Sequence, residues 1–323
     1  QLLFLLPFVQ RIGQLPKPKW GWQDSGVRKI IKLMIPSIVG SSAAQVNLLF
    51  NTLIASFLAA GSISWIYYSD RLLEFPVGVF GVALSTVVLP NLSSKSAVQN
   101  QAQFRSIVQW GIRIALLVSI PAATGLFILS GPLIASIFLG GSFNNHDLYM
   151  TQYSLMAYAF GLIGLSLVLI LAPAYYAKQN TRTPVKYGLI AMVVNASLSI
   201  LFVTTLIFTN SPYPHMGLSL AFSCSTLINA VLLFRGLIRE KEIKIDRDEV
   251  GFFIRVLVAS TIMAVMLLFF NPELPIWLEK NLLGRAIHLM KLIPSAILVY
   301  LFALFCIGIR PRDIRVQTNS EPL

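Results

Sequence analysis

The sequence contains little charge for its length. Only 12% of its 323 residues are Asp, Glu, Lys or Arg, whereas 56% are hydrophobic and the mean hydropathy is +0.73. Soluble globular domains carry about 25% charged residues. The composition therefore excludes an ordinary soluble domain. It predicts an all-α polytopic membrane protein, because long continuous apolar runs cross lipid as helices.

Several catalytic and metal-binding patterns are absent as well. The two cysteines, Cys224 and Cys306, lie in apolar runs, and neither Cys nor His residues have the spacing of a metal site. We find no Ser-His-Asp or Cys-His arrangement, so a membrane glycosyl or acyl transferase has no visible catalytic base. Without a Walker motif, nucleotide hydrolysis has no site in this chain. We therefore expect no enzyme and no cofactor, and we expect the membrane potential or an ion gradient to drive any transport.

Eight runs are long and apolar enough to cross a bilayer, for which about 20 residues suffice. They cover approximately residues 33–58, 64–92, 113–136, 151–176, 187–208, 216–238, 253–271 and 286–309. The chain begins with Gln1 rather than Met, and residues 1–10 have the character of the end of a helix. We therefore expect this sequence to be the C-terminal part of a longer protein.

Basic residues are concentrated in alternate loops. Segment 11–32, the loops after the second, fourth and sixth runs, and the tail 310–323 together hold 20 of the 25 Lys and Arg residues. The positive-inside rule places these segments in the cytoplasm. We thus expect a multi-pass protein of the bacterial inner membrane with a cytoplasmic C-terminus. Orientation explains the net charge of +12, so we expect no nucleic-acid partner.

The runs and loops together predict six segments. They are the end of a helix (1–10), a basic cytoplasmic connector (11–32), a six-helix bundle (33–238), a cytoplasmic loop (239–252), a two-helix hairpin (253–309) and a cytoplasmic tail (310–323). Trp20 and Trp22 favour the lipid headgroup zone. The connector is therefore either partly an interfacial helix or a solvated loop.

Three charges interrupt the second apolar run. Between Leu33 and Ser94 the only charged residues are Asp70, Arg71 and Glu74. Each costs roughly 2.5–3.5 kcal/mol at the centre of a bilayer. Their spacing, together with Tyr67, predicts one polar helix face and hence a water-filled transport cavity. A buried structural ion pair is the alternative, although the net charge of −1 calls for a cation from elsewhere.

The first apolar run has polar and helix-weakening positions of its own. Gln45 and Asn51 are predicted to face the cavity, although hydrogen bonding between helices explains such residues equally well. Pro36 and Gly40 lie near the predicted cytoplasmic end of this run. We expect a hinge there.

Two sequence runs resemble one transporter family. They are Ala55–Leu84 (ASFLAAGSISWIYYSDRLLEFPVGVFGVAL) and Leu171–Gln179 (LAPAYYAKQ), the latter followed by Thr183–Lys186 (TPVK). Both are similar to the MurJ (MviN) family of the multidrug/oligosaccharidyl-lipid/polysaccharide exporter superfamily. The resemblance implies that the chain contains the second six-helix bundle of that fold plus two C-terminal helices, which form a groove for a lipid tail.

The resemblance also implies a function. Proteins of that family move lipid II, the undecaprenyl-diphosphate-linked peptidoglycan precursor, across the bacterial inner membrane by alternating access, for cell-wall synthesis. Asp70, Arg71 and Glu74 match the family's charged motif. Membrane lipids and cell-wall synthesis proteins are the implied partners. The alternatives are a related cation-coupled exporter of drugs or polysaccharide lipids, and a structural scaffold, which leaves the intramembrane charges unexplained.

Overall fold

The structure is a computed structural model that describes residues 7, 10–11, 24–81, 101–243 and 247–310. Within these ranges it is helical, and a single isolated β-bridge joins Gly140 to Phe143. The larger elements are α2 (Ser25–Ser56), α3 (Ser62–Pro76), the π-helix η1 (Val77–Gly81), α6 (Gln101–Ile128), α7 (Ser130–Ile137), α8 (Asn145–Ala177), α9 (Arg182–Phe208), α10 (Met216–Arg239), α11 (Arg247–Phe270), α12 (Leu274–Glu279) and α13 (Leu282–Cys306).

Six of the described helices are long and apolar enough to cross a membrane, namely α6, α8, α9, α10, α11 and α13. They confirm the predicted class, an all-α membrane protein with many spans. Helix α2 has 32 residues but is not among the six. The predicted second span begins as α3 and η1, and residues 82–92 of that span lie outside the described residues.

Three helix boundaries differ from the sequence prediction. Helix α2 begins at Ser25, so residues 25–32 are helical although they were assigned to the connector; Asp24 caps this helix by accepting a hydrogen bond of 2.7 Å from Gly26 N. The run 113–136 is divided between α6 and α7, which meet at Leu129. The short α12, which has Pro275 in its first turn, was not predicted.

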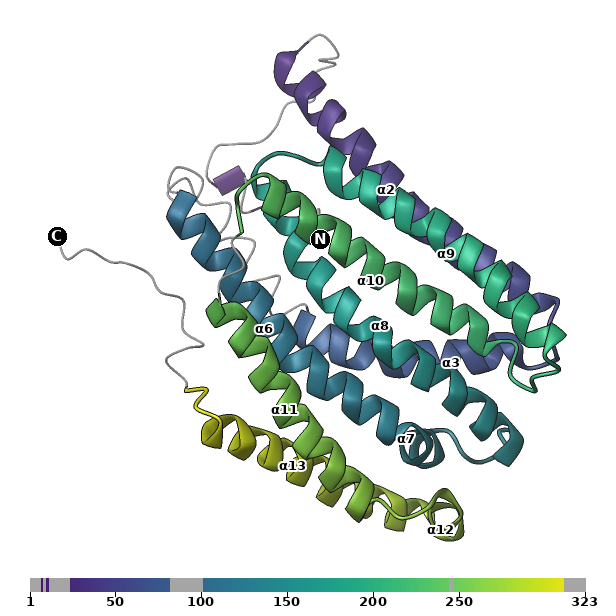
Figure 1. The fold of residues 1–323 in the computed structure, drawn as a ribbon. Coiled ribbons are helices and arrows are strands. Elements are labelled where there is room, and N and C mark those ends of the chain that lie inside the picture. Colours follow the sequence, from purple (N-terminus) through teal and green to yellow (C-terminus); the bar gives the residue numbers. More distant parts are fainter. Residues whose placement is uncertain (1–6, 8–9, 12–23, 82–100, 244–246, 311–323) are drawn as a thin grey trace.

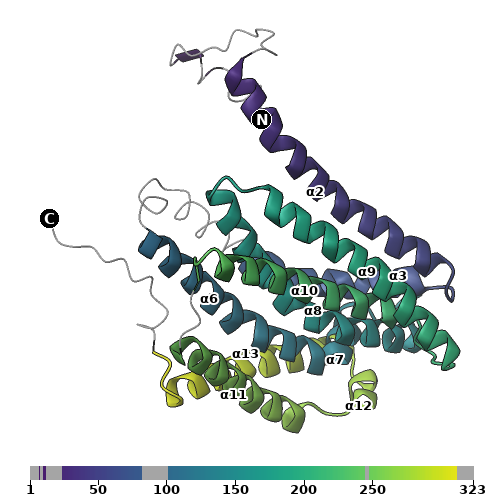
Figure 2. The same ribbon diagram turned by 45° about the horizontal axis from the view of Figure 1, so that its top comes forward.

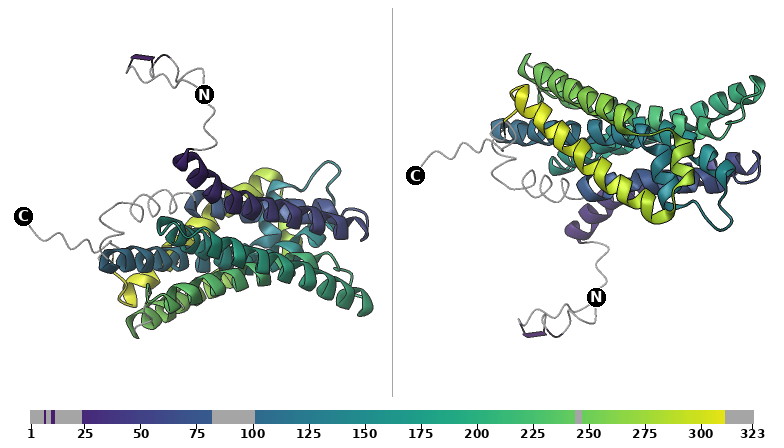
Figure 3. Two further views of the ribbon diagram at one scale, coloured as in Figure 1. Left: turned by 90° about the horizontal axis from the view of Figure 1, so that it is seen from above. Right: turned by 90° about the horizontal axis from the view of Figure 1, so that it is seen from below.

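The long helices form a row of neighbours. Contacts join α2 to α9, α9 to α10, α10 to α8, α8 to α6, α6 to α11 and α11 to α13, and Figure 1 shows this order from the top of the view to the bottom. The N-terminal end of α2 projects beyond the other helices in Figure 2. Seen from above, α2 lies in front, and seen from below α13 does (Figure 3). Helix α8 is therefore in the middle of the row.

Small residues allow α8 and α10 to approach closely. A Cβ atom added to Gly161 would lie 2.7 Å from Ser223 Oγ, and one added to Gly164 would lie 2.7 Å from the backbone N of Leu227. The hydroxyl of Ser223 donates a hydrogen bond of 2.7 Å to Ala157 O across the same interface. Such contacts replace the hydrophobic driving force that helices lack in lipid.

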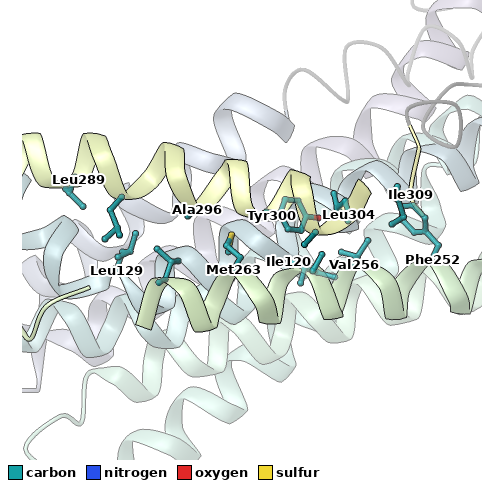
Figure 4. Packing of buried hydrophobic residues seen from close by; sticks show 14 of the residues in the cluster. Ile120, Leu129, Phe252, Val256, Met263, Leu289, Ala296, Tyr300, Leu304 and Ile309 are labelled. Atoms are coloured by element: carbon teal, nitrogen blue, oxygen red, sulfur yellow. The ribbon is translucent and has the colours of Figure 1, made fainter. Parts of the chain in front are cut away.

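The C-terminal helices α11 and α13 pack on α6 through an apolar core. Figure 4 shows this core, which includes Ile120, Val256, Met263 and Leu304. The hydroxyl of Tyr300 on α13 donates a hydrogen bond of 2.7 Å to Leu117 O on α6. This hydroxyl therefore fixes α13 at one position along α6.

Candidate functional site

The site is built on α3, which lies behind α8 in Figure 1. The turn from α2 into α3 contains Gly61, whose φ of 101° is open mainly to glycine. A Cβ atom there would also lie 2.6 Å from the ring of Trp65. The sequence thus requires glycine at this corner, which determines where α3 begins.

One face of α3 is anchored to α8. Trp65 Nε1 donates a hydrogen bond of 2.8 Å to Asp147 Oδ1, and Ser69 Oγ lies 2.9 Å from Thr151 O. Trp65, Ser69 and Leu73, which share this face at intervals of four residues, are at most 4% exposed. The remaining side chains of α3 are therefore held at a constant orientation.

The outward face of α3 presents an accessible ion pair. Arg71 Nη1 lies 2.6 Å from Glu74 Oε2, and these side chains are 49% and 53% exposed. The Arg71 guanidinium also lies 4.9 Å from the ring centroid of Tyr67. Because an exposed ion pair contributes only about 0–1 kcal/mol, an anionic ligand can compete for this arginine at little cost.

Asp70 does not join this ion pair. The sequence placed Tyr67, Asp70, Arg71 and Glu74 on one face; in the structure Asp70 is partly buried and interacts electrostatically with Glu74, Arg71 and Tyr158. Among the described residues, Arg71 forms its ion pair with Glu74 and not with Asp70. Consecutive residues differ by about 100° around a helix, so Asp70 and Arg71 face different surroundings.

Asn51 takes part in pairing between α2 and α9. Its Oδ1 accepts hydrogen bonds from Asn195 Nδ2 at 3.1 Å and from Ser199 Oγ at 3.3 Å, and Asn195 also donates to Asn47 Oδ1 at 2.7 Å. This is the interhelical alternative that the sequence left open. Gln45 is exposed on α2. A contact of either residue with substrate stays a prediction.

The predicted hinge residues Pro36 and Gly40 lie within the helical span of α2. The burial of these two residues lies outside what the structure describes, and hinge motion stays a prediction. A second irregularity follows α3, where Pro76 precedes the π-helix η1. A Cβ atom added to Gly81, the last residue of η1, would meet Leu169 Cδ1 on α8, so the leucine side chain would have to move to accept a larger residue there.

An aromatic cluster at the start of α3 was not predicted. The ring of Trp65 lies 5.6 Å from that of His146 and 5.0 Å from that of His215. The buried His215 Nε2 lies 2.9 Å from Met150 O, so this nitrogen carries the proton. Burial lowers the pKa of His215. One sequence feature could have predicted this cluster. Trp65 lies at a helix start, and His146 and His215 lie in two loops on the same predicted side of the membrane.

A buried arginine at the corner between α12 and α13 was also missed. Arg285 is 8% exposed and donates hydrogen bonds of 2.9 Å to Ala135 O, Trp277 O and Leu278 O. These carbonyls belong to the last turns of α7 and α12. The arginine therefore caps two helix C-termini, where a positive charge is favoured.

Comparison with known proteins identifies the family. The family profile described as "Lipid II flippase MurJ" matches residues 1–283. The "Probable lipid II flippase MurJ" of Haemophilus influenzae is 43% identical over 97% of this chain and 61% of its own length. The protein of the same name from Vibrio cholerae is 43% identical over 99% of this chain and 59% of its own length.

A solved structure agrees with these relatives. The one titled "Lipid II flippase MurJ, inward closed conformation" superposes with a TM-score of 0.69 at 27% identity, covering 93% of this chain and 58% of that one. The chain thus spans about three fifths of the length of the relatives it matches. The family profile covers most of the sequence, and the fold agrees. The chain belongs to the MurJ family of lipid II flippases.

Proposed function

We propose that this chain forms the C-terminal part of a transporter that moves lipid II across the bacterial inner membrane. The carrying observation is Arg71, a half-exposed arginine on a helix whose opposite face is anchored to α8. The names of the relatives supply the substrate class. Among the described residues, Arg71 is paired only with the exposed Glu74, which is a weak partner. The negatively charged diphosphate of a lipid-linked precursor can take the place of this carboxylate.

The chemistry of this step is the exchange of one carboxylate for a phosphate. Arg71 is held by Glu74 and by the ring of Tyr67. Phosphate oxygens accept two parallel N–H bonds from a guanidinium, and such charge-assisted pairs are about twice as strong as neutral hydrogen bonds. Glu74 keeps Arg71 neutralised before substrate arrives. Lysine cannot reproduce the two-pronged contact.

The orientation and the driving force belong to the same proposal. Support for a cytoplasmic C-terminus comes from the concentration of basic residues in alternate loops. Ion pairs on that side involve the first turn of α11 and the C-terminal ends of α8 and α10. They join Arg113 to Glu249 and Lys178 to both Glu240 and Glu242.

Transport is driven by the membrane potential or an ion gradient, and enzymes of cell-wall synthesis receive the product.

The test uses the complete protein in cells that depend on it. Arg71→Ala should abolish growth and the appearance of lipid II on the outer face, and Arg71→Lys should restore only a small part of either. Labelling of lipid II in spheroplasts measures transport. Membrane content and thermal unfolding of the purified variants show that folding is intact.

The matched control is Arg255→Ala, which removes an exposed arginine from α11, away from α3. It should leave growth and lipid II transport unchanged. Full transport by Arg71→Ala would contradict the proposal, as would export of a drug or another polysaccharide lipid without movement of lipid II.

A further inference from the structure

Aromatic side chains join α3 to the turn between α7 and α8. The ring centroid of Tyr68 on α3 lies 4.8 Å from that of Phe138 and 5.5 Å from that of Phe143. Phe138 follows the last residue of α7, and Phe143 lies just before Asn144, which caps α8. Rings at such distances attract each other through their faces and edges. Tyr68 is therefore held by the ends of two other helices.

The turn keeps these two phenylalanines in a defined relation. Gly140 and Phe143 form the isolated β-bridge, with hydrogen bonds of 3.2 and 3.1 Å between their backbone groups. Gly140 and Gly141 have φ values of 149° and 59°, which are open mainly to glycine. Phe143 also packs against the apolar cluster that contains Leu148, and such a pair of residues fixes how a chain enters a helix. The two rings thus form a firm support for Tyr68.

One face of α3 stays open beside this support. Leu72, one turn after Tyr68, packs against the same apolar cluster. A second face of α3 is anchored to α8 through Ser69. Tyr67 is 54% exposed, and the side chain of Arg71 is 49% exposed. These two residues therefore share the face of α3 that the other described helices leave uncovered.

The ring of Tyr67 connects Tyr68 to Arg71. Its centroid lies 5.9 Å from that of Tyr68, at an interplanar angle of 69°, and 4.9 Å from the Arg71 guanidinium. Among the described residues, Tyr68 supplies the one ring that Tyr67 contacts. A half-exposed tyrosine without such a neighbour turns readily about its side-chain bonds, and the guanidinium would lose its support. The rings therefore form a ladder from the turn to the arginine.

We propose that Tyr68 is a positioning residue that orients Arg71 for the diphosphate of the substrate. This step rests on the proposed function. The guanidinium lies over the ring of Tyr67, so the N–H groups at its edge remain available to phosphate oxygens. A guanidinium that is already oriented loses less conformational freedom when it binds. Tyr68 thus increases the affinity for a diphosphate by acting through Tyr67 and Arg71.

The experiment measures binding of farnesyl diphosphate, a short lipid diphosphate without sugar or peptide, to the purified complete protein. Equilibrium dialysis of the radioactive compound gives the affinity. Arg71→Ala should weaken binding at least about tenfold, and Tyr68→Leu, which removes the ring, about threefold. Tyr68→Phe keeps the ring and should bind as the unmodified protein does. In the Arg71→Ala background, Tyr68→Leu should cause no further loss, because the ring acts through the arginine.

Phe160→Leu is the matched control. It removes one member of a ring pair of similar geometry, in which Phe127 of α6 and Phe160 of α8 lie 5.5 Å apart at an interplanar angle of 62°. Diphosphate binding should be unchanged in this variant. Tyr67→Leu alters a half-exposed side chain and should weaken binding as much as Tyr68→Leu does, so the ladder is tested even where Tyr68→Leu does not fold. Thermal unfolding of each variant reports its folding.

Three results would overturn this role of Tyr68. They are full binding by Tyr68→Leu or Tyr67→Leu, a loss in Tyr68→Phe as large as in Tyr68→Leu, and an equal loss in the Arg71→Ala background. Full binding by Arg71→Ala would overturn the proposed function as well. Diphosphate binding that depends on both Arg71 and Tyr68, in a protein that does not move lipid II, would count against the proposed function alone.

Discussion

Two arginines of this chain lie among apolar helices in opposite environments. Arg71 is half exposed and paired with the half-exposed Glu74. Arg285 is buried, and its hydrogen bonds go to three backbone carbonyls. The first arginine has a weak partner that a ligand can replace, whereas the second completes the ends of two helices. Burial and partner type, rather than the presence of charge, separate a binding group from a structural one.

Replacement of Arg285 should give the largest effect on stability. Arg285→Ala leaves carbonyls of α7 and α12 without donors, and we expect a loss of at least about 3 kcal/mol, because hydrogen bonds to charged groups contribute roughly 1.5–3 kcal/mol each. Thermal unfolding in detergent should fall by roughly 6–12 °C. Arg71→Ala, measured in parallel, should unfold within about 2 °C of the unmodified protein. Equal losses in the two variants would invalidate the contrast between these arginines.

Replacement of Trp65 should have an intermediate effect on stability. It tests whether the hydrogen bond from Trp65 to Asp147 holds α3 against α8. Trp65→Phe keeps an aromatic ring beside the two histidines but removes the donor to Asp147. We expect a loss of about 1–2 kcal/mol, since the acceptor is charged and partly buried. Lipid II transport should fall with it, because Arg71 is then less well oriented. Unchanged stability would mean that α3 is held by packing alone.

Acidification should give the smallest effect, through His215. Burial lowers the pKa of this histidine, so the unfolded state binds the proton more readily than the folded state does. Stability is therefore fully present above the unfolded pKa of about 6.5 and decreases as the pH falls below it. His215→Gln retains a donor for Met150 O but does not titrate. On acidification, the unfolding temperature of this variant should fall by about 1–3 °C less than that of the unmodified protein. Identical pH profiles of the two proteins would exclude His215 as the cause.

The membrane class and most helices could be predicted from the sequence, because hydrophobic length and loop charge report directly on membrane spans. Predicted runs such as 151–176 and 187–208 lie within α8 and α9. Boundaries were less predictable where polar residues continue a helix. The basic residues Arg28 and Lys32 indicated a connector, yet the cap at Asp24 starts α2 before them.

The direction in which individual side chains point could be determined only from the structure. Spacing alone grouped Asp70 with Arg71, but only the contacts of Ser69 and Trp65 with α8 show which side of α3 is covered. The role of Arg285 was equally hidden, because its acceptors are backbone atoms as distant as Ala135. Every residue has a backbone carbonyl, so the residue type does not reveal which residue accepts such a hydrogen bond.

The close approach of α8 and α10 has a consequence for leakage. At Gly161 and Gly164 the neighbouring atoms already occupy the place of a side chain, so neither an acyl tail nor a file of water molecules fits between the two helices. At these two glycines the seam between α8 and α10 is therefore closed to lipid and to water.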